Sequence, residues 1–153
     1  AAAAAGRGAS LFVGWGDIER DMGLLDRVKW AQVKKLDRVL EKLIRSYHND
    51  VSRLTDLARQ SLYFHSLGDL VKCLEVIAAD PEVRILRVKN RYDPDYDSLP
   101  SAGYRNVAVL VRIVSDEARE LGLDLHVCEL QLLLIDFALL KNNNGHKRYV
   151  KSR

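Results

Sequence analysis

Two acidic residues stand where the sequence predicts β-strands, and such positions suit metal or phosphate chemistry. Asp56 directly precedes an apolar segment, in RLTDLAR, and Glu129 lies inside another, in HVCELQL. A carboxylate in an apolar strand is costly to bury unless it is paired or binds a metal. Glu129 shares a strand face with Gln131, which gives a polar notch whose oxygens suit Mg²⁺. A solvent-facing strand edge with an ordinary Glu and Gln explains the same pattern.

A row of basic residues offers partners for phosphate. Lys34, Arg38 and Lys42 follow one another at four-residue spacing, which places them on one face if the segment is helical. Such a row can hold a polyphosphate, or it can be the solvated face of a surface helix. The formal net charge of +3 does not decide between these interpretations.

The segment GYRN, residues 103–106, enters an apolar strand pattern from a loop. Tyr104 at a strand mouth can stack on a base, and Arg105 beside it can reach a phosphate or a base edge. A tyrosine that packs over its own loop is the simpler interpretation.

A long helix is expected to carry the basic row. Apolar residues recur at three- and four-residue steps, which predicts one continuous helix over Lys29–Tyr47. The side chains expected to be buried on its inner face are those of Val33, Leu36, Leu40 and Leu43.

The remaining elements predict a sheet that positions the acids and the tyrosine. Two long strands joined by a short polar connection should be antiparallel neighbours. We therefore expect an α+β fold with a mixed, largely antiparallel sheet and flanking helices. A short helix or turn is expected over 17–26, and Ser66 with Asp69 three residues on should cap a helix over 67–79. The other expected elements are strand 57–64, strand 83–88, loop 90–102, strand 105–114, connection 115–122, strand 123–134, and a loop with a helix over 139–150.

Length and composition fit one globular domain. The chain has 153 residues, which we divide into an irregular segment 1–16 and a single domain 17–153. No apolar run approaches the ~18 residues of a membrane span. The two cysteines form no CxxC pair, which indicates free thiols in a reducing intracellular compartment. The first residues, AAAAAGRGAS, lack a secretory signal and suggest a removed transit segment or an excised piece.

The order of these motifs resembles the synthetase domain of the RelA/SpoT alarmone enzymes. The segments that carry the resemblance are KKLDRVLEK, LTDLARQSLYF, GYRNVA and ELQLLL. It implies a nucleotidyltransferase-like fold and Mg²⁺-dependent transfer of pyrophosphate from ATP to a guanine nucleotide.

The resemblance also implies roles for individual residues. Asp56 and Glu129 are expected to be catalytic and to hold Mg²⁺. Two carboxylates brought together in this way repel each other, so the pKa of at least one should rise. Tyr104 is expected to stack on the acceptor guanine. The substrate-binding residues that we expect are Lys34, Arg38, Lys42, Arg59, Tyr104, Arg105 and Gln131.

Four positions depart from the family pattern. Gln32 replaces its first basic residue, Ser61 stands where an arginine is usual, Ala108 replaces a histidine, and Leu133 replaces the arginine after Glu-x-Gln. These changes leave a second hypothesis open. The chain could be a catalytically inactive module with a structural or interaction role, and a protein partner, in a larger protein or assembly.

Overall fold

The computed structural model describes residues 13–101 and 103–140, and the chain divides into two compact units, Ala1–Trp30 and Ala31–Arg153. In the first unit, α1 (Trp15–Arg20) is followed by a 3₁₀ turn over Met22–Arg27. The rings of Trp15 and Trp30 meet edge to face, with centroids 6.5 Å apart. The short helix or turn expected within residues 17–26 is therefore confirmed.

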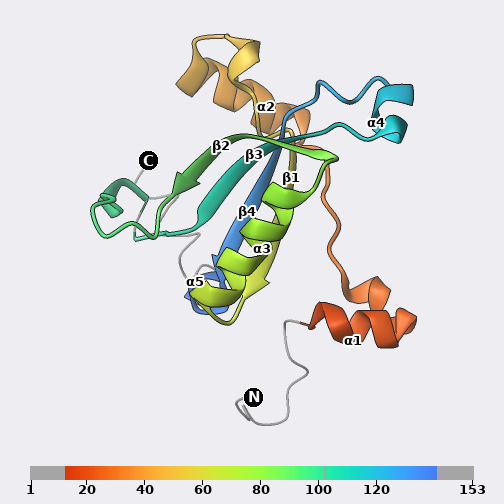
Figure 1. Ribbon diagram of the computed structural model, residues 1–153. Helices are drawn as coiled ribbons and strands as arrows, with labels where there is room; N and C mark the ends of the chain where they lie inside the picture. The colour runs from red at the N-terminus through yellow and green to blue at the C-terminus, as the bar shows by residue number, and fades with distance from the viewer. Residues whose placement is uncertain (1–12, 102, 141–153) are drawn as a thin grey trace. The chain divides into compact units, whose positions relative to one another are not determined.

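The second unit is built on a four-stranded sheet in the order β1-β4-β3-β2 (Figure 1). β4 is parallel to β1 and antiparallel to β3, which in turn is antiparallel to β2. The α+β fold with a mixed sheet is therefore confirmed, and so is the antiparallel pairing of the two neighbouring strands. The strands are β1 (Ala58–Phe64), β2 (Val83–Asn90), β3 (Val107–Ile113) and β4 (Cys128–Leu134).

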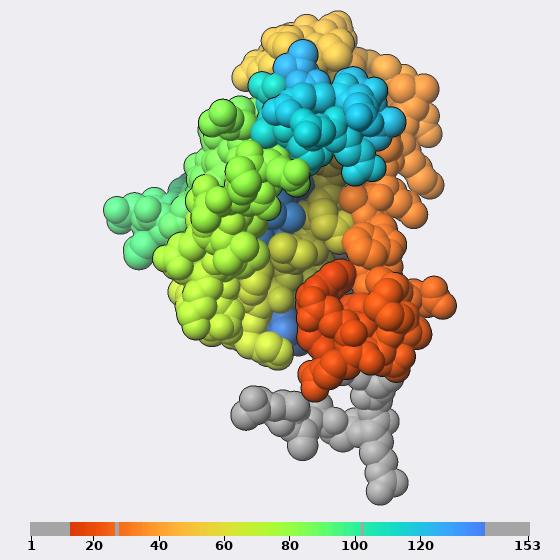
Figure 2. Space-filling model, turned by 45° about the vertical axis from the view of Figure 1, so that its right-hand side comes forward, coloured from red at the N-terminus to blue at the C-terminus, as the bar shows by residue number. Residues whose placement is uncertain are grey.

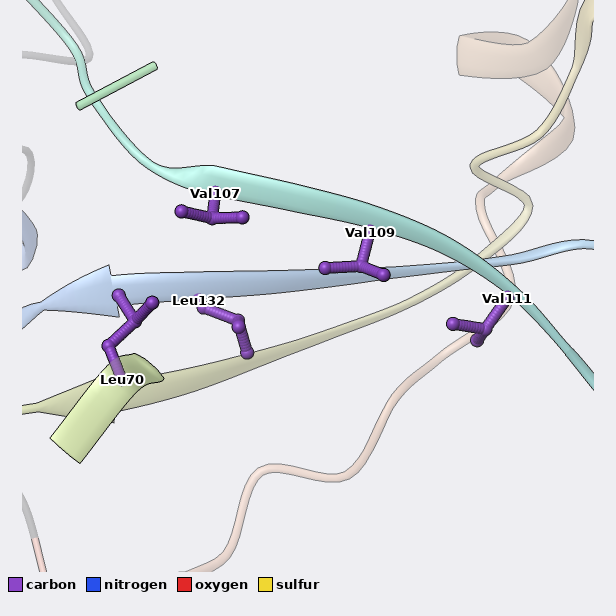
Figure 3. Close-up of a cluster of buried hydrophobic side chains, with 5 residues drawn as sticks. All are labelled: Leu70, Val107, Val109, Val111 and Leu132. Carbon is purple, nitrogen blue, oxygen red and sulfur yellow. The ribbon is translucent and has the colours of Figure 1, made fainter. Parts of the chain in front are cut away.

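One face of the sheet is apolar and is covered by α3 (Leu67–Ala79). The helix begins as predicted, because the Ser66 side chain accepts a hydrogen bond from the backbone N–H of Asp69. Leu70 of this helix is buried against the inner side chains of β3 and β4 (Figure 3). These side chains are those of Val107, Val109, Val111 and Leu132. Because side chains alternate along a strand, the residues between them turn to the opposite face.

Two short helices complete the described fold. α4 (Asp116–Glu120) connects β3 to β4 and is capped by the Ser115 side chain. α5 (Ile135–Leu140) follows β4 directly and contacts β4 and β1. Most of the loop and helix expected over 139–150 lies outside the described residues. Within the described ranges, none of the helices is long and apolar enough to cross a membrane.

The predicted helix over Lys29–Tyr47 is wrong in extent. Only α2 (Leu36–Lys42) and a π-helical turn over Leu43–Tyr47 are helical. Helix formation starts late because the backbone N–H of Lys34 donates to the carbonyl of Leu57, 2.9 Å away, which holds this stretch beside the entrance to β1.

The predicted buried face of this helix is also largely wrong. Leu43 is buried, but Val33, Leu36 and Leu40 are 76%, 69% and 47% exposed. The apolar residues do repeat at helical spacing in the sequence, but no hydrophobic core packs against Val33, Leu36 and Leu40 within the described part of the chain.

The predicted strand over residues 123–134 is correct only in its second half. Backbone hydrogen bonds from Leu123 to the carbonyl of Ala118 and from His126 to that of Leu123 form turns before β4 begins. Glu129 is therefore the second residue of β4 rather than a mid-strand residue. Since β1 and β4 are parallel, Asp56 and Glu129 lie at the same end of the sheet, where both strands start.

Candidate functional site

An ion cluster centred on Asp56 lies where β1 begins. The Asp56 residue is 6% exposed, and its Oδ2 accepts a hydrogen bond from Nζ of Lys34. Nζ of Lys42, the last residue of α2, lies 2.9 Å from the same oxygen. Within the described residues, the other oxygen, Oδ1, is buried without a hydrogen-bond partner. Two ammonium groups, one from just before α2 and one from its last residue, therefore share one oxygen, while the second oxygen has no hydrogen-bond partner.

The ion cluster is charged at neutral pH. Burial tends to raise the pKa of Asp56, but hydrogen bonds from Lys34 and Lys42 outweigh it, and the pKa lies below its usual value. Burial tends to lower the pKa of Lys42, but hydrogen bonds with Tyr47 and Asp56 outweigh it and raise that pKa. The expected rise in a carboxylate pKa does not occur at Asp56, because cations rather than a second carboxylate surround it.

Glu129 lies on the sheet face opposite α3, which we call the polar face. Its Oε1 accepts a hydrogen bond from Nε2 of Gln131 two residues on. Across the sheet, Glu129 lies beside Arg59 of β1, and Gln131 lies beside Ala108 of β3. The predicted Glu-x-Gln notch therefore exists, and a cation from the neighbouring strand stands next to it.

The edge strand adds two cations that the sequence analysis did not single out. Arg87 lies across from Leu110, and Lys89 lies across from Ala108, on the same polar face. Both are exposed, and among the described residues neither forms an ion pair with a carboxylate. The signal was the alternation in VRILRV, from which we predicted only a strand over 83–88, which ends one residue before Lys89.

Tyr104 is half-buried near the polar face. Burial, together with Tyr63 and Tyr92, raises its pKa to about 12, while Arg59 and Arg91 act in the opposite direction. The Arg59 guanidinium and the Tyr104 side chain therefore influence each other electrostatically.

The backbone before Tyr104 needs a glycine. Gly103 has a φ of +80°, in the left-handed region that a side chain disfavours. The loop therefore turns at Gly103 immediately before it presents the tyrosine.

The other two predicted arginines are engaged outside this site. Arg105 donates from its guanidinium to the backbone carbonyls of Arg91, Asp93 and Tyr96, at 3.0, 2.7 and 3.2 Å. Arg38 pairs with Glu41 on the exposed side of α2. The structure thus gathers Lys34, Lys42 and Asp56 in the ion cluster, and Arg59, Glu129, Gln131 and Tyr104 on or near the polar face.

A pocket of about 270 Å³ lies on the apolar side of the sheet. Ile77 of α3, Val83 and Val111 line it, with Arg59 and Glu129 among its other lining residues. Figure 2 shows atoms of β1 and β4 at the base of a hollow beside α3. Its lining is apolar, so a polyphosphate fits the ion cluster and the polar face better than this pocket.

The carboxylate oxygens of Asp56 and Glu129 fit a magnesium ion whose other ligands are water and the phosphates of a substrate. No group of three or more His, Cys, Asp or Glu side chains that could hold a metal is found within the described residues. Mg²⁺ often takes only one or two carboxylates and fills its shell with water and substrate phosphates. The buried, unpartnered Oδ1 of Asp56 offers one such ligand, and Glu129 at the same end of the sheet offers the second.

Comparison with known proteins finds similarity in structure only. No protein-family model matches the chain, and no curated protein matches it either. A GTP pyrophosphokinase family protein from Streptococcus pneumoniae matches with a TM-score of 0.56 and 16% identity, over 78% of this chain and 56% of that one.

Two small alarmone synthetases from Bacillus subtilis are also similar. Synthetase 1, solved bound to its product pppGpp, matches with a TM-score of 0.58 and 17% identity, over 76% of this chain and 60% of that one. Synthetase 2 matches with a TM-score of 0.59 and 16% identity, over 90% and 74%. This chain thus spans less than two thirds of the length of the Streptococcus pneumoniae protein and of synthetase 1 bound to pppGpp. The resemblance to alarmone synthetases is confirmed at the level of the fold.

Proposed function

We propose that this chain is a nucleotide-binding synthetase domain that transfers pyrophosphate from ATP to a guanine nucleotide with the help of Mg²⁺. The observation that carries the proposal is the convergence of Lys34 and Lys42 on Asp56, at the end of the sheet where Glu129 also stands. A fold shared with enzymes that are pyrophosphokinases and alarmone synthetases supports it.

The ion cluster suits the donor nucleotide. Its two ammonium groups and one carboxylate leave a net positive charge, and phosphate oxygens can compete with Asp56 for both lysines. When bound, Mg²⁺ held by Asp56 and Glu129 supplies charge neutralisation on the phosphates. Lys34 and Lys42, held beside that carboxylate, are placed to contact the phosphate chain and fix its position.

The polar face suits the acceptor. Tyr104 offers a ring for a guanine base, and Arg59, which lies directly across from Glu129, offers a cation. In the transfer, the acceptor 3′-hydroxyl oxygen bonds to the β-phosphorus of ATP, the bond to the α-phosphate oxygen breaks, AMP leaves, and the hydroxyl proton is released. Such a reaction needs alignment and charge neutralisation rather than a covalent nucleophile.

The departures from the family pattern weaken the acceptor side most. Ala108 offers no phosphate contact where the family has a histidine, and Leu133 is 2% exposed, so neither binds an anion. Lys89 lies directly across from Ala108 on the polar face and can supply the missing cation. If it does not, the chain retains nucleotide binding without transfer, as the inactive-module hypothesis predicts.

Calorimetry tests the donor half of the proposal. We expect a non-hydrolysable ATP analogue to bind, and to bind more tightly with Mg²⁺ than without it. Lys34→Met should weaken binding by roughly tenfold to a hundredfold, since a charge-assisted hydrogen bond contributes about 1.5–3 kcal/mol.

Lys35→Met is the matched control. Lys35 is the adjacent residue, it is exposed, and its substitution removes the same charge. Equal losses in the two variants would indicate non-specific attraction, and the absence of heat with any nucleotide would refute the proposal.

A further inference from the structure

The turn that follows α2 has an unusual geometry. Residues Leu43–Tyr47 wind as a π-helix, in which hydrogen bonds join residues five apart. In a regular α-helix, residues five apart point about 140° away from each other, because each residue adds about 100°. The wider π-helical turn places Tyr47 near the side chain of Lys42, five residues earlier.

The contact between these residues is specific. Nζ of Lys42 lies 4.9 Å from the centre of the Tyr47 ring, and Cζ of Arg53 lies 5.4 Å from it. The same Nζ is 2.9 Å from Oδ2 of Asp56. The lysine ammonium group thus touches an aromatic ring and a carboxylate at once, and its four-carbon stem loses much of its freedom.

We propose that Tyr47 is a positioning residue, which holds the Lys42 ammonium group against Asp56 so that the lysine is already in place for the donor phosphates. A cation over a tyrosine ring is held by the ring quadrupole, and a pre-ordered lysine loses less entropy when it binds an anion. The π-helical turn is the device that creates the contact. This inference rests on the proposed function for its binding readout, but the ordering of Lys42 stands apart from it.

Three variants separate positioning from packing. Tyr47→Phe keeps the ring and removes the hydroxyl, whereas Tyr47→Leu removes both. Tyr92→Phe is the control, because its hydroxyl accepts a hydrogen bond from the backbone N–H of Leu134 at 2.9 Å, in another part of the fold. The first readout is ¹³Cε relaxation of Lys42 in the free protein, and the second is the affinity for an ATP analogue with Mg²⁺.

In Tyr47→Leu, we expect Lys42 to become as mobile as an exposed lysine and the affinity to fall by roughly tenfold. Tyr47→Phe keeps the ring over Lys42 but loses the hydrogen bond of the hydroxyl with it, so both properties should fall between those of the unmodified protein and those of Tyr47→Leu. Tyr92→Phe should change neither, even if it lowers stability. Should Tyr47→Leu not fold, Tyr47→Met removes the ring while keeping an unbranched apolar side chain, and the same two losses are expected of it.

Two results would overturn the inference. The first is an ordered Lys42 side chain in Tyr47→Leu, and the second is a Lys42 that becomes mobile without any loss of affinity. If the unmodified protein binds no nucleotide, the proposed function fails, and the relaxation of Lys42 still decides whether Tyr47 positions it.

Discussion

Arg59 of β1 lies directly across from Glu129 of β4, so the first carboxylate of β4 has a cation on the neighbouring strand. Because the two strands are parallel, both residues stand near the end of the sheet where Asp56 enters β1. The arrangement places opposite charges side by side on one face, near the end of the sheet where the ion cluster lies.

Glu129→Gln should separate metal dependence from stability. Glu129 is half-buried, and its hydrogen bond with Gln131 has a substitute in the new amide. We expect the free energy of unfolding to change by less than about 1 kcal/mol. The Mg²⁺-dependent part of nucleotide binding should disappear in calorimetry. A variant that still binds more tightly with Mg²⁺ would remove Glu129 from the metal site.

Asp56→Asn should destabilise the fold. Removing the shared carboxylate leaves Lys34 and Lys42 facing each other, each with only 21–29% of its side chain exposed. We expect a loss of about 1–3 kcal/mol in urea unfolding at pH 7. Unchanged stability would show that the ion cluster contributes nothing to the fold.

The Asp56 carboxylate should also make the stability of the fold depend on pH, in a direction that its lowered pKa defines. Its pKa in the folded state is lowered from 3.8, so its stabilisation is present above that value. The stabilisation should fade as the pH drops below 3.8 through the lower folded pKa. The difference in stability between the unmodified protein and Asp56→Asn should therefore shrink on acidification over this range, and a difference that grows would contradict the assignment.

Two leucine substitutions test which side chains belong to the hydrophobic core. Leu132→Ala, at a residue with 0% exposure, should cost about 2–5 kcal/mol. Leu40→Ala, at a residue that is 47% exposed, should cost less than about 1 kcal/mol. Denaturant unfolding measures both, and a larger loss at Leu40 would mean that another surface covers it.

Arg105→Ala should loosen the loop over residues 91–101 without affecting the strands. The guanidinium holds three backbone carbonyls of this loop, and alanine replaces none of these hydrogen bonds. We expect faster hydrogen exchange in the loop and unchanged protection in β3 and β4. If the loop keeps its protection while guanine nucleotide affinity falls, Arg105 binds substrate directly, as the sequence first suggested.

Local signals predicted much of the fold. The Ser66 cap fixed the start of α3, and the alternation in β3 and in the second half of β4 identified two neighbouring strands. These features depend on residues close in sequence, which is why they can be predicted without knowledge of the tertiary structure.

Tertiary contacts decided the rest. The backbone hydrogen bond from Lys34 to Leu57 shortens the expected helix. Lys34 and Lys42 lower the pKa of Asp56, and their contact with it could not be predicted because they are distant from it in the sequence. The exposed apolar stripe with Leu36 and Leu40 looked like a core face, because periodicity shows amphipathicity but not what covers it. Lys89 was missed because its neighbour across the sheet, Ala108, is known only from the strand register.

The most direct test is the transfer reaction itself. The protein is incubated with ATP labelled in the β-phosphate, a guanine nucleotide and Mg²⁺, and the products are separated by chromatography. We predict label in a guanine nucleotide that has gained a 3′-pyrophosphate, with an equal amount of AMP, and no product when Mg²⁺ is removed or in Glu129→Gln. Mg²⁺-dependent binding of both nucleotides without any labelled guanine product would contradict the enzymatic account.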